Sequence, residues 1–230
     1  MEEKKAIILL SGGIDSATCL ALAIEQHYEP FCLSVLYKQR HAVELEAAKR
    51  IAAFFNVKEH KILTLDLSAI GGSALTSSLE VPKDRIIEHS EEIPKTYVPA
   101  RNTIFLALAL AWAEVMEAGD IFIGTNAVDF SGYPDCRPGF IKKFEELANI
   151  ATKAAVENKI HFRIHAPLVH LTKSAIITLA IKKGVNLSLT HSCYDPTVKG
   201  IACGRCDSCL LRLKGFKEAG LEDPAVYFEY

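Results

Sequence analysis

Apolar residues along this chain form short continuous runs that alternate with longer stretches in which they recur every three or four positions. Continuous runs are typical of strands buried on both faces, and the spaced pattern predicts helices that bury one side. The runs predict strands at residues 6–10, 31–37, 61–65, 120–123 and 162–166. Helices are predicted at residues 16–26, 101–118 and 172–183, and at the apolar positions Leu45, Ala48, Ala52 and Phe55.

Strands and helices that alternate in this way predict an α/β fold with a doubly wound, mainly parallel, Rossmann-like sheet. Ligands of such sheets lie beyond the carboxyl ends of the strands, where the strand order reverses. Residues 11–16 and 124–126 directly follow two predicted strands, so we expect both segments at that place. Residues 68–98 contain Gly71-Gly72, Pro82 and Pro94 and should form a long loop, a feature that often acts as a lid.

The composition limits the class of protein. Half of the 230 residues (50%) are hydrophobic, which suits one α/β domain, expected at residues 1–190, and a small lobe with a C-terminal helix at residues 191–230. The longest apolar stretch, residues 104–113, falls short of the roughly 18 residues that a membrane span needs, and residues 1–10 lack a signal-peptide pattern. We therefore expect a cytoplasmic protein. A net charge of −2 without a basic block favours small-molecule substrates over nucleic acid.

Four of the seven cysteines follow a C-x9-C-x2-C-x2-C spacing, at Cys193, Cys203, Cys206 and Cys209. Cytosolic thiols stay reduced, so this cluster indicates metal binding rather than disulfides. Four thiolates with no open position are typical of a structural zinc site, although similar spacing also holds iron-sulfur clusters. A local cluster of unliganded thiols would leave this short segment with little core. Cys19 and Cys32 fall in apolar patterns and are expected to be buried hydrophobes.

The turn after the first predicted strand reads Ser11-Gly12-Gly13-Ile14-Asp15-Ser16. Two glycines let the backbone approach a ligand closely, and the N-terminus of the following helix favours an anion. The turn matches neither the Walker motif nor the G-x-G-x-x-G fingerprint. The alternative is a tight turn in which Ser11 or Asp15 only caps the helix.

This Ser-Gly-Gly-x-Asp-Ser turn resembles the PP-loop of ATP pyrophosphatases, which split ATP between its α and β phosphates. The resemblance implies that ATP binds with Mg2+ and that Asp15 either caps the helix or faces the magnesium ion. Because the turn contains no cation, Lys173 and Arg101, each at a predicted helix start, are the candidates for offsetting the charge of the pyrophosphate. The alternative for each of them is a solvated surface residue. The nucleotide-binding residues implied are Leu10, Ser11, Gly12, Gly13, Ile14, Asp15, Ser16 and Ala17.

Together with this turn, residues 97–103 (YVPARNT), residues 131–138 (SGYPDCRP) and the cysteine segment make nearly the whole chain resemble the 7-cyano-7-deazaguanine synthase (QueC) family. The resemblance implies a homodimeric ligase that uses ATP and ammonia to convert 7-carboxy-7-deazaguanine into a nitrile through adenylated intermediates and an amide, in queuosine biosynthesis. It implies no nucleic-acid or membrane partner.

Several residues near the 131–138 motif are candidates for substrate binding. Asp129 or Asp135 could accept the N–H donors of the deazaguanine edge, Arg137 could pair with the substrate carboxylate, and Tyr133 could stack on the ring. The alternative is a Gly/Pro-rich surface loop. Phe130 stands where the family favours tyrosine, which puts any role of that hydroxyl in doubt. His41 is expected to cap a helix rather than to move a proton.

Two other functions fit parts of the pattern. A PP-loop enzyme that transfers sulfur to tRNA would use a reactive cysteine such as Cys136 and an iron-sulfur cluster. A non-catalytic nucleotide sensor would bind ATP without releasing AMP, and would use the zinc lobe to contact a partner.

Overall fold

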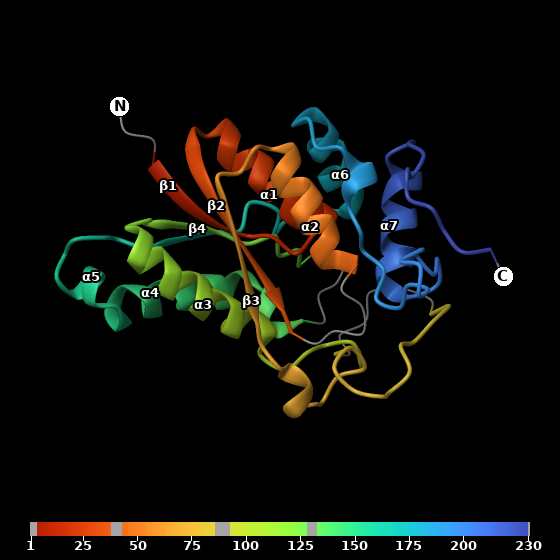
Figure 1. Cartoon of the computed structure of the whole chain (residues 1–230), viewed down its shortest axis with the longest axis horizontal. Helices are drawn as coiled ribbons and strands as arrows, with labels where there is room; N and C mark the ends of the chain where they lie inside the picture. The colour runs from red at the N-terminus through yellow and green to blue at the C-terminus, as the bar shows by residue number, and fades with distance from the viewer. Residues whose placement is uncertain (1–3, 38–42, 86–92, 128–132, 230) are drawn as a thin grey trace.

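The computed structural model describes residues 4–37, 43–85, 93–127 and 133–229. At its centre lies a five-stranded parallel sheet with helices on both faces (Figure 1). The strands are β1 (Lys4–Leu9), β2 (Tyr28–Leu36), β3 (Glu59–Thr64), β4 (Asp120–Phe122) and β5 (Arg163–His165), in the order β3-β2-β1-β4-β5. The predicted fold class is confirmed, and each predicted strand is present with its bounds shifted by at most three residues.

The helices are α1 (Ile14–Glu25), α2 (Val43–Phe54), α3 (Arg101–Met116), α4 (Pro138–Ala151), α5 (Lys153–Val156), α6 (Lys173–Lys182) and α7 (Asp207–Glu218). Helix α4 was not predicted. Pro138 was assigned to the end of a loop, but proline suits the first position of a helix, and Ile141, Phe144 and Ala148 form the buried side of α4. None of the described helices has the length and apolarity that a membrane span requires.

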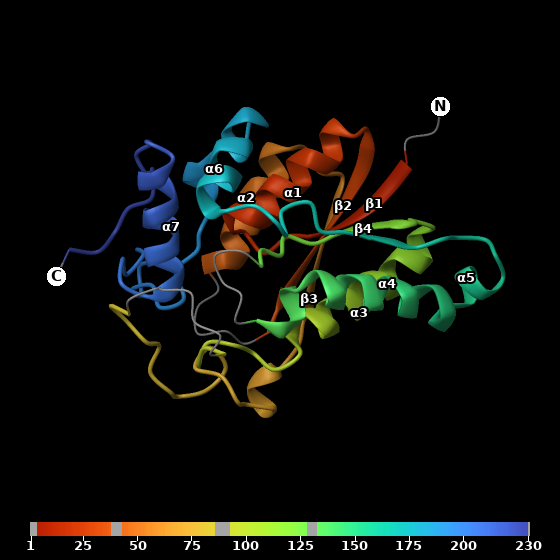
Figure 2. The same cartoon turned by 180° about the vertical axis from the view of Figure 1, so that it is seen from behind.

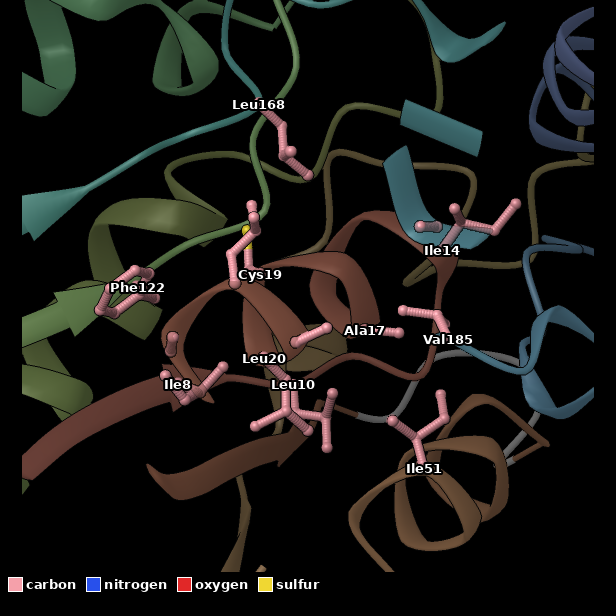
Figure 3. Close-up of a cluster of buried hydrophobic side chains, with 14 of the residues drawn as sticks. Ile8, Leu10, Ile14, Ala17, Cys19, Leu20, Ile51, Phe122, Leu168 and Val185 are labelled. Atoms are coloured by element: carbon pink, nitrogen blue, oxygen red, sulfur yellow. The ribbon is translucent and has the colours of Figure 1, made fainter. Parts of the chain in front are cut away.

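Side chains that alternate along the central strands divide the core into two layers. Ile8 and Leu10 point toward α1, α2 and α6, and Figure 3 shows them packed with Leu20, Ile51 and Phe122. Ile7 and Leu9 point to the opposite face, against α3 and α4. Burial on both faces explains why these strands read as continuous apolar runs.

Beyond the sheet, α7 lies beside α6 at one end of the molecule (Figures 1 and 2). The long loop after β3 contains one short 3-10 helix (Leu67–Ala69) among its described residues, as the glycines and prolines predicted. Leu75 and Val81 of this loop pack with the four clustered cysteines, and Lys83 pairs with Asp195 at 2.9 Å. The described part of the loop is therefore fixed to the cysteine segment.

Candidate active site

The glycine turn joins β1 to α1 at the point where the strand order reverses, since β2 and β4 lie on opposite sides of β1. Gly12 has a φ of +91°, and a Cβ on it would overlap the carbonyl oxygen of Glu44 and lie 2.8 Å from the amide nitrogen of Ala48. Glycine is therefore required here both for its backbone conformation and for the close approach of α2. The turn and the N-terminus of α2 form one packed unit.

The two serines of the turn hold its shape. The Ser16 hydroxyl donates to the carbonyl of Gly13 at 3.1 Å and accepts from the amide of Ser11 at 3.1 Å, and the hydroxyls of Ser11 and Ser16 are 3.1 Å apart. Gly13 occupies the N-cap position of α1, which has no side-chain cap hydrogen bond among the described residues; the Ser11 hydroxyl accepts from the amide of Gly13 at 3.4 Å, and the Asp15 carboxylate contacts Lys173. The first amides of α1 have no partner within the helix and can bind an anion.

Lys173 lies opposite this turn at the start of α6. Its ammonium contacts both carboxylate oxygens of Asp15, at 2.6 and 2.8 Å, and both side chains are largely buried. The side-chain hydroxyl of Thr172 accepts from the amide of Ala175 and fixes the helix start. Lys173 is therefore not a solvated surface residue, and its cation lies beside the first turn of α1.

A cavity of ≈ 270 Å³ opens in front of the turn. Of the predicted nucleotide-binding and catalytic residues, Leu10, Ser11, Gly13, Ile14, Asp15, Ser16, Arg101 and Lys173 line this cavity, whereas Gly12 and Ala17 lie behind its wall. Gly124, Thr125 and Asn126, which follow β4, line it as expected. Thr125 is buried, and its hydroxyl has no hydrogen-bond partner among the described residues, so it is available to a ligand.

The aromatic end of the cavity is built around Arg101. The guanidinium of Arg101 lies 6.0 Å from the ring centre of Tyr37, and Tyr133 and Tyr194 contribute further hydroxyl-bearing rings. Burial alone would lower the pKa of Arg101, but these neighbouring tyrosines outweigh burial and raise it. Arg101 therefore stays charged in an aromatic environment. Tyr37, Tyr194 and Glu44 were not singled out by the sequence, because their approach depends on tertiary packing.

Some of the predicted substrate-binding residues line the cavity, and others do not. Tyr133 lines the cavity, and its hydroxyl is 2.9 Å from that of Thr96. Asp135 is buried outside the lining, where its carboxylate accepts from the backbone amide of Asn102 at 2.9 Å. Arg137 is exposed at the N-cap of α4 and also lies outside the lining. Asp129, Phe130 and His41 fall outside the described residues, so these assignments stay predictions.

Cys136 lines the same cavity, but its environment does not suit a nucleophile. Its sulfur accepts from the side-chain amide of Asn102 at 3.2 Å, and burial raises the pKa of the thiol to about 12, against the opposing effect of Arg101. Because the thiolate is the reactive form, this cysteine is poorly suited to sulfur transfer.

The four clustered cysteines converge as their spacing predicted. The sulfurs of Cys193, Cys203, Cys206 and Cys209 lie within 4.8 Å of one another, and all four residues are buried. Backbone amides donate to these sulfurs: Cys203 N to Cys193 Sγ at 3.2 Å, and Tyr194 N to Cys206 Sγ at 3.4 Å. Hydrogen bonding by Cys193 lowers the pKa of Cys203 and Cys206. Four sulfur donors at these separations fit one tetrahedral metal ion.

The cysteine segment also touches the cavity. The amide of His191 donates to the carbonyl of Gly12 at 2.9 Å, and Ser192 and Tyr194 line the cavity. On α7, a Cβ at Gly215 would lie 2.5 Å from Cγ of Lys173, so α6 and α7 meet at the stem of that lysine. The site is therefore shared between the sheet and the C-terminal segment.

A parallel sheet that leads through a Ser-Gly-Gly turn into a helix N-terminus, above a cavity lined by two partly buried cations, defines an α/β protein of the PP-loop ATPase type. Residues 5–220 match the family model described as "Queuosine biosynthesis protein QueC". The chain belongs to this family, as the sequence motifs indicated.

Named relatives agree with this membership, and a solved structure agrees with the fold. Proteins named 7-cyano-7-deazaguanine synthase from Myxococcus xanthus and Syntrophotalea carbinolica are 60% and 61% identical to this chain, and the alignments cover 98% and 97% of it and 98% and 96% of the relatives. The structure of NMN synthetase from Francisella tularensis superposes with a TM-score of 0.51 at 17% identity, over 96% of this chain and 78% of that one. At that identity the superposition supports the fold alone.

Proposed function

We propose that this chain is an ATP-dependent 7-cyano-7-deazaguanine synthase, which converts 7-carboxy-7-deazaguanine and ammonia into the nitrile in queuosine biosynthesis. The observation that carries the proposal is the near-complete alignment, at about 60% identity, with proteins of that name. The cavity adds physical support, because the glycine turn, two cationic side chains and several tyrosines line one cavity.

In each half of the reaction, ATP converts an oxygen atom of the substrate into part of an AMP leaving group. The substrate carboxylate attacks the α-phosphorus of ATP, pyrophosphate leaves, and ammonia displaces AMP from the acyl adenylate to give the amide. A second ATP adenylates the amide oxygen, and loss of AMP and a proton yields the nitrile. Such steps need orientation and charge stabilisation more than a protein nucleophile.

The roles assigned to the phosphate end follow from its contacts. The turn from Ser11 to Ala17 holds the pyrophosphate through backbone amides and the serine hydroxyls. Lys173 offsets the charge that develops on the pyrophosphate, and Asp15, which pairs with Lys173, would be the residue to hold the Mg2+ that accompanies ATP. Arg101, which lines the same cavity, stabilises negative charge beside the tyrosines.

The deazaguanine binds at the aromatic end, where Tyr133 is within reach of a ring. Asp129 and Arg137 remain our candidates for the base edge and the carboxylate. Asp135 remains a candidate as well, although its contact with Asn102 favours a role in holding the start of α3.

The four sulfurs hold one Zn2+ in this proposal, which closes the C-terminal lobe and has no open position for chemistry. We further propose a cytoplasmic homodimer that acts on small molecules and binds no nucleic acid. The division into residues 1–190 and 191–230 stays a prediction.

One assay tests the function. Purified protein is incubated with ATP, ammonium and 7-carboxy-7-deazaguanine, the product is followed by mass, and the nucleotide is followed by chromatography. Formation of the nitrile with release of AMP supports the proposal. Release of ADP, or binding of ATP without any product, would overturn it.

A further inference from the structure

Two carboxylates line the described part of the cavity, and they differ in their partners. Both oxygens of Asp15 contact Lys173. Glu44, on the first turn of α2, makes no hydrogen bond or ion pair with another described residue, although it lines the same cavity. A partly buried carboxylate without a partner is costly to keep in a protein unless it interacts with a ligand or exchanges a proton.

The backbone of Glu44 is held firmly in place. Its carbonyl oxygen packs against Gly12 at a distance that only the absence of a Cβ allows, so α2 and the phosphate-binding turn are in close contact. Glu44, the turn and Arg101, which begins α3 on the other layer, line the same cavity, and Glu44 and Arg101 interact electrostatically.

The electrostatic surroundings suit proton transfer near neutral pH. Burial raises the pKa of Glu44 to about 7, against the opposing effect of Arg101. The other titratable groups that surround this pair are Tyr37 at the end of β2, Tyr133, Tyr194 and Cys136. Each has a raised pKa and so stays neutral when Glu44 ionises. A base is most effective when its pKa is near the working pH.

We propose that Glu44 is the general base of the amide-forming step and takes the proton from ammonium as it becomes the nucleophile. In this step, the proton of one N–H bond of ammonium moves to the Glu44 carboxylate, and the electron pair of that bond remains on nitrogen. The nitrogen uses this pair to form the C–N bond. The C–O bond to AMP breaks, and AMP leaves with the electron pair of the C–O bond. The second proton lost on forming the amide goes to AMP or water. This inference rests on the proposed function, since it requires an acyl adenylate and ammonia.

The test is the pH dependence of kcat/KM expressed per total ammonium, with ATP and 7-carboxy-7-deazaguanine saturating. In the wild type, the value should rise with pH and level off above about 7, because ammonium itself is used once Glu44 is ionised. In Glu44→Gln, only free ammonia can attack, so the value should fall about 10²-fold at neutral pH. As the pH increases, kcat/KM of Glu44→Gln should rise by about tenfold per pH unit and approach the wild-type value.

Three further measurements make the outcome specific. Glu46→Gln removes the same charge from the same helix turn, at an exposed residue that pairs with Lys49, and should leave the profile unchanged. Glu44→Asp should keep the plateau at a lower rate. Exchange of labelled pyrophosphate into ATP, which needs the carboxylate substrate and no ammonia, should stay within about twofold in Glu44→Gln, since a base for nitrogen plays no part in adenylation.

Several results would overturn the inference. A wild-type value that climbs steadily past pH 8 would show that free ammonia is the substrate. A Glu44→Gln variant with an unchanged profile and a raised KM for the deazaguanine would assign Glu44 to recognition of the base. Loss of pyrophosphate exchange would assign it to adenylation. Absence of exchange in the wild type would contradict the proposed function itself.

Discussion

The contact between α7 and α6 makes the substitution Gly215→Ala an informative perturbation. Gly215 lies inside α7, and an added Cβ would be 2.5 Å from Cγ and 3.0 Å from Cβ of Lys173, and 2.9 Å from Cδ1 of Ile177. The atoms of Lys173 belong to the stem of the side chain. They cannot move without either separating the helices or turning the lysine away from Asp15.

Two opposing effects set the magnitude. Alanine is favoured over glycine in a helix by roughly 0.5–1 kcal/mol, whereas an extra methyl group in a packed contact costs about 1–3 kcal/mol. Because the clash involves three atoms within 3.0 Å, we expect packing to outweigh propensity. The free energy of unfolding should fall by about 1–2 kcal/mol. A displacement of Lys173 by about 1 Å should lower kcat/KM for ATP by up to 10²-fold.

Urea unfolding measures the first effect, and AMP release at varied ATP measures the second. Gly139→Ala is the matched control, because a Cβ on this exposed residue of α4 meets no atom within 4 Å. It should leave activity unchanged and alter stability by no more than about 1 kcal/mol, in the favourable direction. If Gly215→Ala matches this control in both assays, the contact does not position Lys173, and the reasoning is wrong.

The remaining predictions concern the ion pairs and the metal. Lys173→Met should lower kcat/KM for ATP by about 10²–10³-fold, while Lys182→Met, at an exposed position of the same helix, should not. Cys203→Ser should reduce the zinc content measured by mass spectrometry and lower the melting temperature. Burial alone would raise the pKa of Asp223, but hydrogen bonds from Arg212 and Tyr227 outweigh it and lower the pKa. The stability contributed by Asp223 is therefore present above the ordinary aspartate pKa and is lost as pH falls through the lowered one. Asp223→Asn should remove that acid dependence and cost about 3–5 kcal/mol in urea unfolding at neutral pH, because Arg212 is left buried and unpaired.

Sequence patterns predicted the strands and the cysteine cluster, because these features depend mainly on residues that are close together in the sequence. The strand before Ser11 is buried on both faces, so its apolar residues form a continuous run, and such a run predicts a strand. The cysteine spacing predicted convergence because chain geometry alone brings Cys203, Cys206 and Cys209 together. Helix α4 was missed because Pro138 can either end a loop or begin a helix, and a local pattern does not separate the two.

The partners of the site residues could not be predicted, since they come from distant parts of the chain. Lys173 was predicted from a resemblance, but its pairing with Asp15 joins residues 158 positions apart. Glu44 lies with Glu46 in the first turn of a helix, where a solvated carboxylate is the usual expectation. Its place in the cavity depends on the packing of α2 against Gly12, which appears only in three dimensions.

The C-terminal segment contributes to the geometry of the site as well as to the stability of the fold. A structural metal site that only closed a lobe would need no contact with the glycine turn. Here the amide of His191 donates to the carbonyl of Gly12, Tyr194 lines the cavity beside Arg101, and Gly215 packs on the stem of Lys173. If the four cysteines were no longer held together, the glycine turn, the aromatic end of the cavity and Lys173 would therefore all be disturbed. Metal loss should accordingly weaken ATP binding at temperatures where the sheet is still folded, because the sheet core is built from other residues.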